Sequence, residues 1–358
     1  MKTILLNPGP VTLSERVRQS LLGDDLCHRE IEFTSLQSDI RNKLLSIYRL
    51  ADADWAATLM TGSGTAAVEA MVTSLIPETG KLLIIENGVY GERMTRIAER
   101  YGIATQTLRN NWEAPIDYAA VERALEADSA ISHVAVVHHE TTTGRLNELA
   151  PLATLCRQHG AAILLDAVSS FGAETIDFAN WPIAACAATA NKCLHGVPGT
   201  CFVVVNRDSL ANAHPRGVYL DLVAYVAAQD KAGTPFTQSV QTFYALDEAL
   251  NELIEQGGVE CRRQTYRSRM GQIRSLLIEL DVKPFLKDDE VSCVLHAYEI
   301  PSTTNYVKLH DDLKAQGFVI YAGQGPYAEN MFRISMMGEI SDSDVERLGR
   351  ALKVALQA

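Results

Sequence analysis

Short apolar segments alternate with amphipathic segments through the first two thirds of the chain. The apolar segments have the length of β-strands, and we predict seven of them, at residues 55–60, 81–86, 104–108, 133–139, 161–166, 183–188 and 201–205. Helical spacing of apolar residues predicts helices between many of these strands, at residues 65–75, 91–101, 118–127 and 147–158. Strands that alternate with helices form a mostly parallel sheet covered by helices. The pattern therefore predicts an α/β fold with a seven-stranded sheet.

The pattern changes after about residue 240. The pattern of the last third predicts two long helices at residues 242–256 and 260–280. It then predicts three short strands at 291–298, 319–321 and 331–335, and a final helix at 341–356. Ser341 is a suitable N-cap for the last of these helices. We predict a large domain of residues 15–245 and a smaller α+β domain formed by residues 1–14 and 246–358.

Composition narrows the class of protein. The chain has 358 residues, 47% of them hydrophobic and 21% charged, which is ordinary for a globular protein of about two domains. A net charge of −12 disfavours a nucleic-acid surface, because such a surface needs clustered basic residues. The seven cysteines are scattered and read as reduced thiols. No segment approaches the apolar length of a secretory signal or a membrane span. We expect a cytoplasmic protein that binds neither nucleic acid nor membrane.

A glycine turn follows the first predicted strand, in the segment TGSGTAA at residues 61–67. Such a turn at a helix start presents free backbone N–H groups, which favour a phosphate. The same segment also satisfies a dinucleotide fingerprint, with Glu86 at the end of the next strand where a ribose-binding acid would lie. On this turn alone, a phosphate-bearing cofactor and a nicotinamide or flavin dinucleotide remain equally open.

Three further residues fit pyridoxal 5′-phosphate (PLP) and have no role in dinucleotide binding. Asp166 ends a buried strand, where a carboxylate could keep a pyridine nitrogen protonated. Lys192 follows the next apolar strand in a Gly/Pro-rich context, and burial there would make its amine nucleophilic. Tyr90 follows the strand after the glycine turn and could lie on the cofactor ring. The order of these residues along the chain favours PLP.

A metal centre is not expected. His138, His139 and Glu140 are adjacent, but neighbours on a strand point to opposite faces and are poorly placed to share one ion.

Seven segments between residues 7 and 334 resemble class V aminotransferases. They read NPGPV (7–11), CHREIEF (27–33), GSGT (62–65), HETTTG (139–144), DAVSSFG (166–172), ANKC with GVPG (190–193 and 196–199), and FRI (332–334). The CHRE and ANKC strings resemble the members of the family that act on phosphonates.

The resemblance implies PLP fold type I and a homodimer with shared active sites. It implies that Lys192 forms the Schiff base with PLP and moves protons, and that Asp166 pairs with the ring nitrogen. Further cofactor contacts implied by the family fall on Ser63, Gly64, Thr65, Thr141, Asn191 and the partner subunit's Thr237. Arg333 resembles the arginine that binds a substrate carboxylate, which its planar guanidinium suits. Gly9 and Arg29 are expected beside the substrate.

The activity implied is transfer of an amino group from 2-aminoethylphosphonate to pyruvate, giving phosphonoacetaldehyde and L-alanine. Two departures favour an alternative donor. Residues 232–238 read AGTPFTQ, without the arginine that the phosphonate pattern has there, and Ser335 stands where glycine is expected. Another class V aminotransferase, of alanine–glyoxylate or phosphonoalanine type, therefore stays open, as does a dinucleotide-dependent oxidoreductase.

Overall fold

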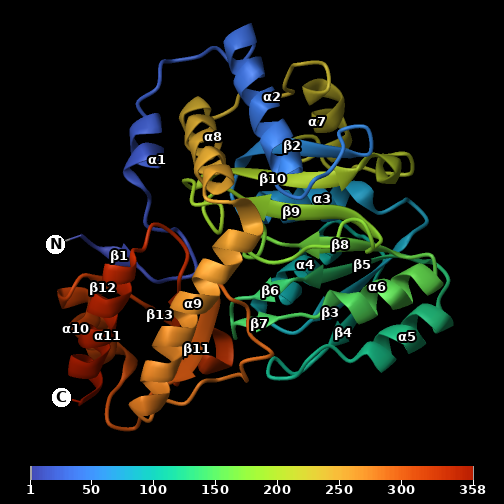
Figure 1. Cartoon of the computed structure of the whole chain (residues 1–358). Helices are drawn as coiled ribbons and strands as arrows, with labels where there is room; N and C mark the ends of the chain where they lie inside the picture. Colours follow the sequence, from blue (N-terminus) through green and yellow to red (C-terminus); the bar gives the residue numbers. More distant parts are fainter. Residues whose placement is uncertain (1, 358) are drawn as a thin grey trace.

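A seven-stranded sheet forms the centre of the protein (Figure 1), which we describe from a computed structural model for residues 2–357. Its strands are β2 (Trp55–Gly62), β3 (Lys81–Glu86), β4 (Thr105–Arg109), β5 (Ile131–Val137), β8 (Ala162–Asp166), β9 (Ile183–Thr189) and β10 (Gly199–Asn206). They lie in the order β2-β10-β9-β8-β5-β3-β4. All neighbours are parallel except β10, which runs antiparallel to both β2 and β9. The α/β fold with a mostly parallel seven-stranded sheet is confirmed.

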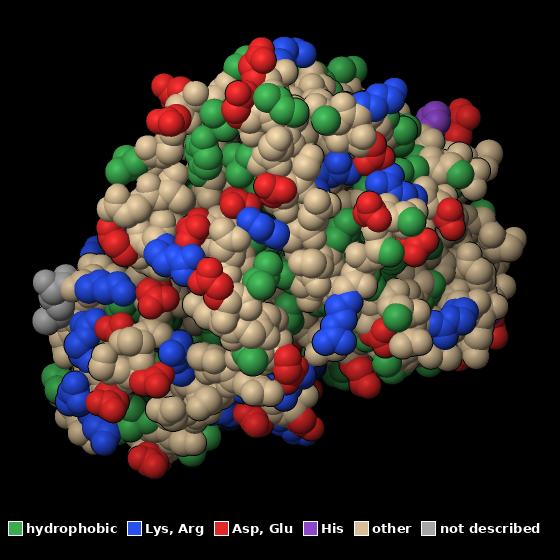
Figure 2. All heavy atoms as spheres, turned by 45° about the horizontal axis from the view of Figure 1, so that its top comes forward, with side chains coloured by type: hydrophobic (Ala, Val, Ile, Leu, Met, Phe, Trp, Pro, Cys, Tyr) green, Lys and Arg blue, Asp and Glu red, His purple; other side chains and the backbone are tan. Residues whose placement is uncertain are grey.

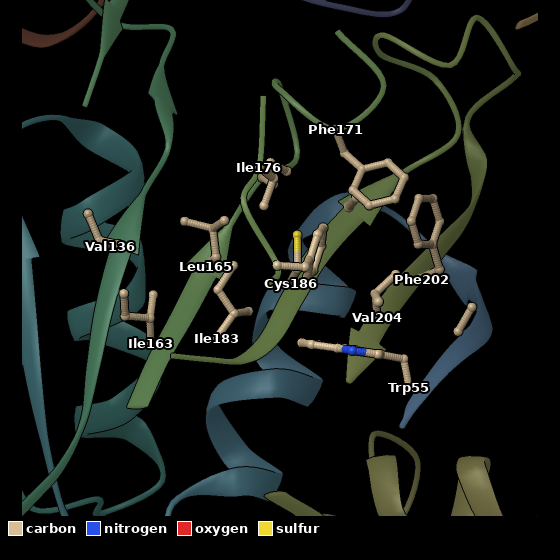
Figure 3. Close-up of a cluster of buried hydrophobic side chains, with 14 of the residues drawn as sticks. Trp55, Val136, Ile163, Leu165, Phe171, Ile176, Ile183, Cys186, Phe202 and Val204 are labelled. Atoms are coloured by element: carbon tan, nitrogen blue, oxygen red, sulfur yellow. The ribbon is translucent and has the colours of Figure 1, made fainter. Parts of the chain in front are cut away.

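Helices cover both faces of this sheet. Side chains alternate between the faces along each strand, so Ile163 and Leu165 enter one apolar cluster and Leu164 enters another. The first cluster is shared with α2 (Ile31–Ser46), α5 (Tyr118–Ala127), α6 (Leu149–Gln158) and α8 (Val240–Glu255). The second is shared with α3 (Gly64–Leu75), α4 (Val89–Arg100) and α7 (Leu222–Gln229). Figure 3 shows part of the first cluster, where side chains of β5, β8, β9 and β10 project from the same face of the sheet.

A third apolar cluster joins the start of the chain to its last third. Strand β1 (Ile4–Leu5) pairs in parallel with β12 (Phe318–Val319). The elements beside it are α9 (Gly258–Glu279), β11 (Leu295–Glu299), α10 (Tyr306–Ala315), β13 (Tyr321–Ala322), β14 (Met331–Ser335) and α11 (Asp342–Gln357). The division into residues 15–245 and the remainder stays our proposal. Helix α8, which crosses its upper boundary, packs with the first cluster.

Most predicted elements of the sheet and its crossovers form within a few residues of their predicted bounds. The predicted strand at 319–321 is instead two strands in different sheets, because β12 pairs with β1 and β13 pairs with β14. Ser341 caps α11 as predicted, since its Oγ accepts from the backbone N–H of Asp344 at 3.1 Å. The elements that the pattern did not predict are α1 (Glu15–Ser20), α2, α7, α10, β1, β6 (His139–Glu140), β7 (Arg145–Leu146) and the short 3₁₀ helices Arg207–Leu210 and Gly325–Tyr327.

The surface is mixed in charge. On the face seen in Figure 2, acidic and basic side chains are interspersed and the basic ones form no continuous stripe. Within residues 2–357, no helix has both the length and the apolar character that a membrane crossing requires.

Candidate active site

A cavity of about 250 Å³ lies at the edge of the sheet where β8 and β9 end. Its wall combines the start of α3, the first turn of α4, the end of β8 and the loop between β9 and β10. The lining residues are Gly62, Ser63, Gly64, Thr65, Val68, Tyr90, Arg93, Asp166, Val168, Thr189, Asn191, Lys192, Pro198 and Gly199. The carboxyl ends of parallel strands are where open α/β sheets bind ligands.

The glycine turn supplies hydrogen-bond donors at the start of α3. Ser63 is the N-cap in an extended conformation, and its side chain makes no capping hydrogen bond. The first N–H groups of a helix lack partners within the helix, and the helix dipole makes this end positive. A Cβ on Gly64 would lie 2.9 Å from both methyl carbons of Val168, so a larger residue would push the turn away from the cavity.

Asp166 ends β8 with its carboxylate buried in the wall of the cavity. Its Oδ1 accepts from the backbone N–H of Val168 at 3.0 Å. Burial raises the pKa of this carboxyl to about 6, against the opposing effects of that hydrogen bond and of the positive charges of Arg93 and Lys192. The group is therefore mainly ionised at neutral pH, and a nearby positive charge would stabilise it further.

Lys192 lies on the loop after β9 and extends its amine toward the start of the chain. Its Nζ donates to the backbone carbonyl of Pro8, and a Cβ on Gly9 would lie 2.6 Å from its Cδ. The positive φ of 108° at residue 9 favours glycine, and a side chain there would displace the end of the Lys192 side chain. Burial lowers the pKa of the Lys192 amine to about 8. About a tenth of this amine is then neutral at pH 7 and about half at pH 8, far more than for an unperturbed lysine.

The lysine loop is fixed to the third apolar cluster. His195 has a positive φ of 70°, its Nε2 accepts from the backbone N–H of Gly338 at 2.9 Å, and it also contacts the Tyr266 hydroxyl. Burial lowers the pKa of His195 well below its usual value, so the ring is neutral and its Nε2 is able to accept. These contacts couple the position of Lys192 to the last third of the chain.

Glu140 is a buried carboxyl that sequence reasoning did not assign a role. Its Oε2 accepts from the backbone N–H of Tyr90 at 3.2 Å, and its Oε1 accepts from the Thr142 hydroxyl at 2.6 Å. Burial raises its pKa to about 7. The side chain fits only because residue 88 is glycine, since a Cβ there would lie 2.2 Å from its Cδ. Glu140 therefore fixes the backbone that presents Tyr90 to the cavity.

Thr141 and Arg333 lie together behind the cavity. Arg333 is buried and donates from Nη1 to the backbone carbonyl of Thr141 at 2.8 Å and from Nε to that of Ala322 at 2.9 Å. Its charge contributes to lowering the pKa of the Lys192 amine. The Thr141 hydroxyl is buried and has no hydrogen-bond partner among the residues described. It is a donor that a ligand could satisfy.

Five residues expected at the site are absent from the lining of this cavity in the single chain: Gly9, Arg29, Thr141, Thr237 and Arg333. Thr237 is exposed on the loop that leads into α8, and Arg29 is exposed on the loop that precedes α2. Glu86, the acid of the dinucleotide alternative, is also absent from the lining and forms an ion pair with Arg109 at 3.1 Å. The dinucleotide alternative therefore receives no support from the geometry.

Arg93 is the charged lining residue that sequence reasoning missed. It lies three positions after Tyr90 on α4, and its guanidinium carbon is 4.8 Å from the centre of the Tyr90 ring. Residues three apart on a helix share a face, so the position of Tyr90 already contained the signal that could have identified it.

The cavity fits PLP. It offers a buried carboxylate, an amine whose pKa is lowered, and a turn of backbone donors at a positive helix end. The unpartnered Thr141 hydroxyl lies outside this lining, on the segment bonded to Arg333. A lysine and an aspartate in this relation at the edge of a mostly parallel sheet define a PLP-dependent enzyme of fold type I.

Comparison with known proteins identifies the family. The sequence profile of the Aminotransferase class-V family matches residues 20–348, and the chain belongs to this family. A 2-aminoethylphosphonate–pyruvate transaminase of Bacillus mycoides is 36% identical over 96% of this chain and 95% of its own length. One of Klebsiella pneumoniae is 37% identical over 99% of this chain and 97% of its own length. The chain is a PLP-dependent aminotransferase.

Solved structures agree with this family. An aspartate aminotransferase of subgroup IV from Thermus thermophilus superposes with a TM-score of 0.91 at 25% identity, over 99% of each chain. A ureidoglycine–glyoxylate aminotransferase from Bacillus subtilis gives 0.90 at 26% identity, over 100% of this chain and 93% of its own. These substrates differ from one another, so the fold leaves the amino donor open.

Proposed function

We propose that this aminotransferase transfers the amino group of 2-aminoethylphosphonate to pyruvate, giving phosphonoacetaldehyde and L-alanine. The observation that supports this most directly is the likeness, over nearly the whole chain, to proteins named for that reaction. The chain also has the CHRE and ANKC strings that resemble members acting on phosphonates.

Lys192 and Asp166 have the central roles in this proposal. PLP, when bound, supplies an aldehyde that takes up the amino group and a protonated ring that accepts electrons. The Lys192 amine is the only lysine amine in the cavity wall, and we assign it the attachment of the cofactor and the movement of the proton from the donor carbon. The Asp166 carboxylate keeps a proton on the ring nitrogen, because its negative charge stabilises that positive charge.

The remaining assignments follow from the contacts of each side chain. We assign the Thr141 hydroxyl as a donor to the cofactor's phenolic oxygen. This hydrogen bond would give the buried Thr141 hydroxyl the partner that it lacks. The residues that we propose hold the phosphate line the cavity at the glycine turn and the lysine loop. They are Ser63, Gly64, Thr65 and Asn191. Arg333 binds the carboxylate of pyruvate. Its Nη2 has no hydrogen-bond partner within residues 2–357 and is able to donate to that group.

We further propose a homodimer with shared active sites, in which Thr237 reaches the partner's phosphate site. The segment around Thr237 is fixed beside the glycine turn, because Thr61 Oγ1 donates to Gln238 Oε1 at 2.7 Å. Tyr219 packs on Phe236, 5.0 Å between ring centres, and the neighbouring Val218 is 82% exposed. An exposed apolar surface next to an exposed site residue supports an interface with a second copy. Arg29 is proposed to contact substrate only in that assembly.

A second candidate donor is favoured by the segment at residues 232–238. It contains no arginine, and its one lysine neighbour, Lys231, is exposed. The family members that act on phosphonates have an arginine in this segment, so an anionic phosphonate would meet less positive charge here than in those members. An alanine–glyoxylate or phosphonoalanine aminotransferase would need less or differently placed charge there.

A donor panel tests the proposal. Purified holoenzyme is supplied with pyruvate and each of 2-aminoethylphosphonate, phosphonoalanine and other amines, and L-alanine is measured; alanine with glyoxylate is assayed as glycine formed. We expect the highest kcat/KM with 2-aminoethylphosphonate. Formation of alanine from other amines but not from this one would reject the proposal while leaving the family intact. The Lys192→Ala variant measures the background rate.

The pKa of Lys192 predicts how fast the apoenzyme captures PLP at different pH. The neutral amine is the nucleophile, and burial lowers its pKa to about 8. The capture rate should therefore rise with pH up to about 8 and level off above it. The rate is measured as the appearance of yellow colour after mixing, with free lysine under the same conditions as the reference. An enzyme profile that follows free lysine toward its higher pKa would contradict the prediction.

A further inference from the structure

Arg93 is a cation in the cavity wall without an acidic partner. Among residues 2–357, no carboxylate lies within ion-pair distance of its guanidinium. Its one side-chain hydrogen bond runs from Nη1 to the Thr65 hydroxyl at 3.1 Å. A guanidinium has five N–H donors, so most of its capacity is available to a ligand. Half-buried positive charge without a counter-ion indicates that the site is built for an anion.

Two positive features meet at Thr65. One is the amino end of α3, where the backbone N–H groups lack partners. The other is Arg93, which reaches the same residue from α4. The Tyr90 ring lies 4.8 Å from the guanidinium carbon and restricts where the arginine can point. Both features line the same cavity as Asp166 and Lys192, and the charge of Arg93 also acts to lower the pKa of the Asp166 carboxyl.

We propose that Arg93 binds the phosphate group of PLP, together with the glycine turn at Ser63-Gly64-Thr65. Tyr90 stabilises the guanidinium in the orientation that permits this. The inference rests on the proposed role of that turn as the phosphate site, and it is independent of which amine is the donor. Its planar fork gives Arg93 two parallel N–H groups for two phosphate oxygens, a contact that lysine cannot reproduce.

The test compares binding of PLP with binding of pyridoxal, which lacks the phosphate. Apoenzyme is titrated with each ligand and the dissociation constants are read from absorbance, with no donor present. Arg93→Gln should weaken PLP roughly 10- to 100-fold, the value of a charge-assisted hydrogen bond, and leave pyridoxal unchanged. Arg93→Lys should recover part of the loss. Arg96→Gln is the matched control, because Arg96 is exposed on the same helix and outside the cavity lining.

Each other outcome is decisive. If the PLP-to-pyridoxal preference of Arg93→Gln equals that of the wild type, the inference is overturned, and equal weakening of both ligands overturns it as well.

Thr65→Val separates the role of Arg93 from the role of the glycine turn as the phosphate site. A lower preference for PLP over pyridoxal in Thr65→Val but not in Arg93→Gln rejects only the role of Arg93. No change in either variant also rejects the glycine turn as the phosphate site. If Arg93→Gln does not fold, Arg93→Lys decides. An unchanged preference for PLP over pyridoxal, together with a higher KM for the amino donor, would assign Arg93 to substrate binding and overturn the inference.

Discussion

Replacing Lys192 with alanine is expected to lower kcat/KM for amino transfer on the order of 10⁴-fold or more, because it removes both the covalent attachment and the proton carrier. Lys192 is the one lysine in the cavity wall, so no second amine is placed to substitute for it. Alanine at this position removes the contact to the Pro8 carbonyl but leaves the backbone of the loop in place. Initial rates with saturating pyruvate measure the loss.

Borohydride reduction provides an independent check on Lys192. Reduction of the wild-type holoenzyme should fix the cofactor to the peptide that contains residue 192, as read by mass spectrometry. The Lys192→Ala protein should retain no covalent cofactor after the same treatment. Lys314→Ala is the control, because Lys314 is exposed on α10. A reduced adduct on any other lysine, or wild-type turnover by the alanine variant, would refute the role of Lys192.

Asp166→Asn should lower kcat on the order of 10³-fold while leaving the affinity for PLP near that of the wild type. Asparagine keeps the shape of the side chain and the oxygen that accepts from the Val168 N–H. It removes the negative charge that stabilises a proton on the ring nitrogen, and that charge matters most when electrons move into the ring. Steady-state kinetics, together with a PLP titration, separate the two effects.

The control for Asp166 is Asp208→Asn, since Asp208 is exposed on the 3₁₀ helix Arg207–Leu210. Its kinetics should match those of the wild type. If Asp166→Asn loses PLP affinity and kcat in parallel, the carboxylate acts in binding instead. If neither changes, Asp166 is a structural residue of the strand end.

The elements with a strong local pattern were the ones that the sequence predicted well. The helix Tyr118–Ala127 and the strand Met331–Ser335 have the predicted bounds, because each has apolar periodicity bounded by clear breaks. Helix α2 was missed because Gln37 lies on its buried side. The Gln37 side chain is satisfied by donating to the backbone carbonyl of Gly233 at 2.9 Å, a partner far away in the sequence. A buried polar residue with a distant partner interrupts the apolar pattern on which such predictions depend.

The same distinction applies to the site. The glycine turn, Asp166 and Lys192 were predicted because each follows a strand in a recognisable local context, and the structure brings them to one cavity. Arg93 and Glu140 were not predicted, because their importance arises from contacts between α4 and other segments. The single chain leaves Gly9, Arg29, Thr141, Thr237 and Arg333 outside the lining of the cavity, so their roles stay predictions, and that of Thr237 depends on a partner.

The pairing of β1 with β12 sets an order of assembly during synthesis. Strand β1 begins at Ile4, and its partner begins at Phe318. A ribosome adds residues at roughly 5–20 per second, so the first strand waits on the order of tens of seconds for its neighbour. All seven strands of the central sheet have left the ribosome before then. The Pro8 and Gly9 segment beside Lys192 follows β1 directly. The backbone contact that holds the Lys192 amine is therefore completed last, when translation is nearly finished.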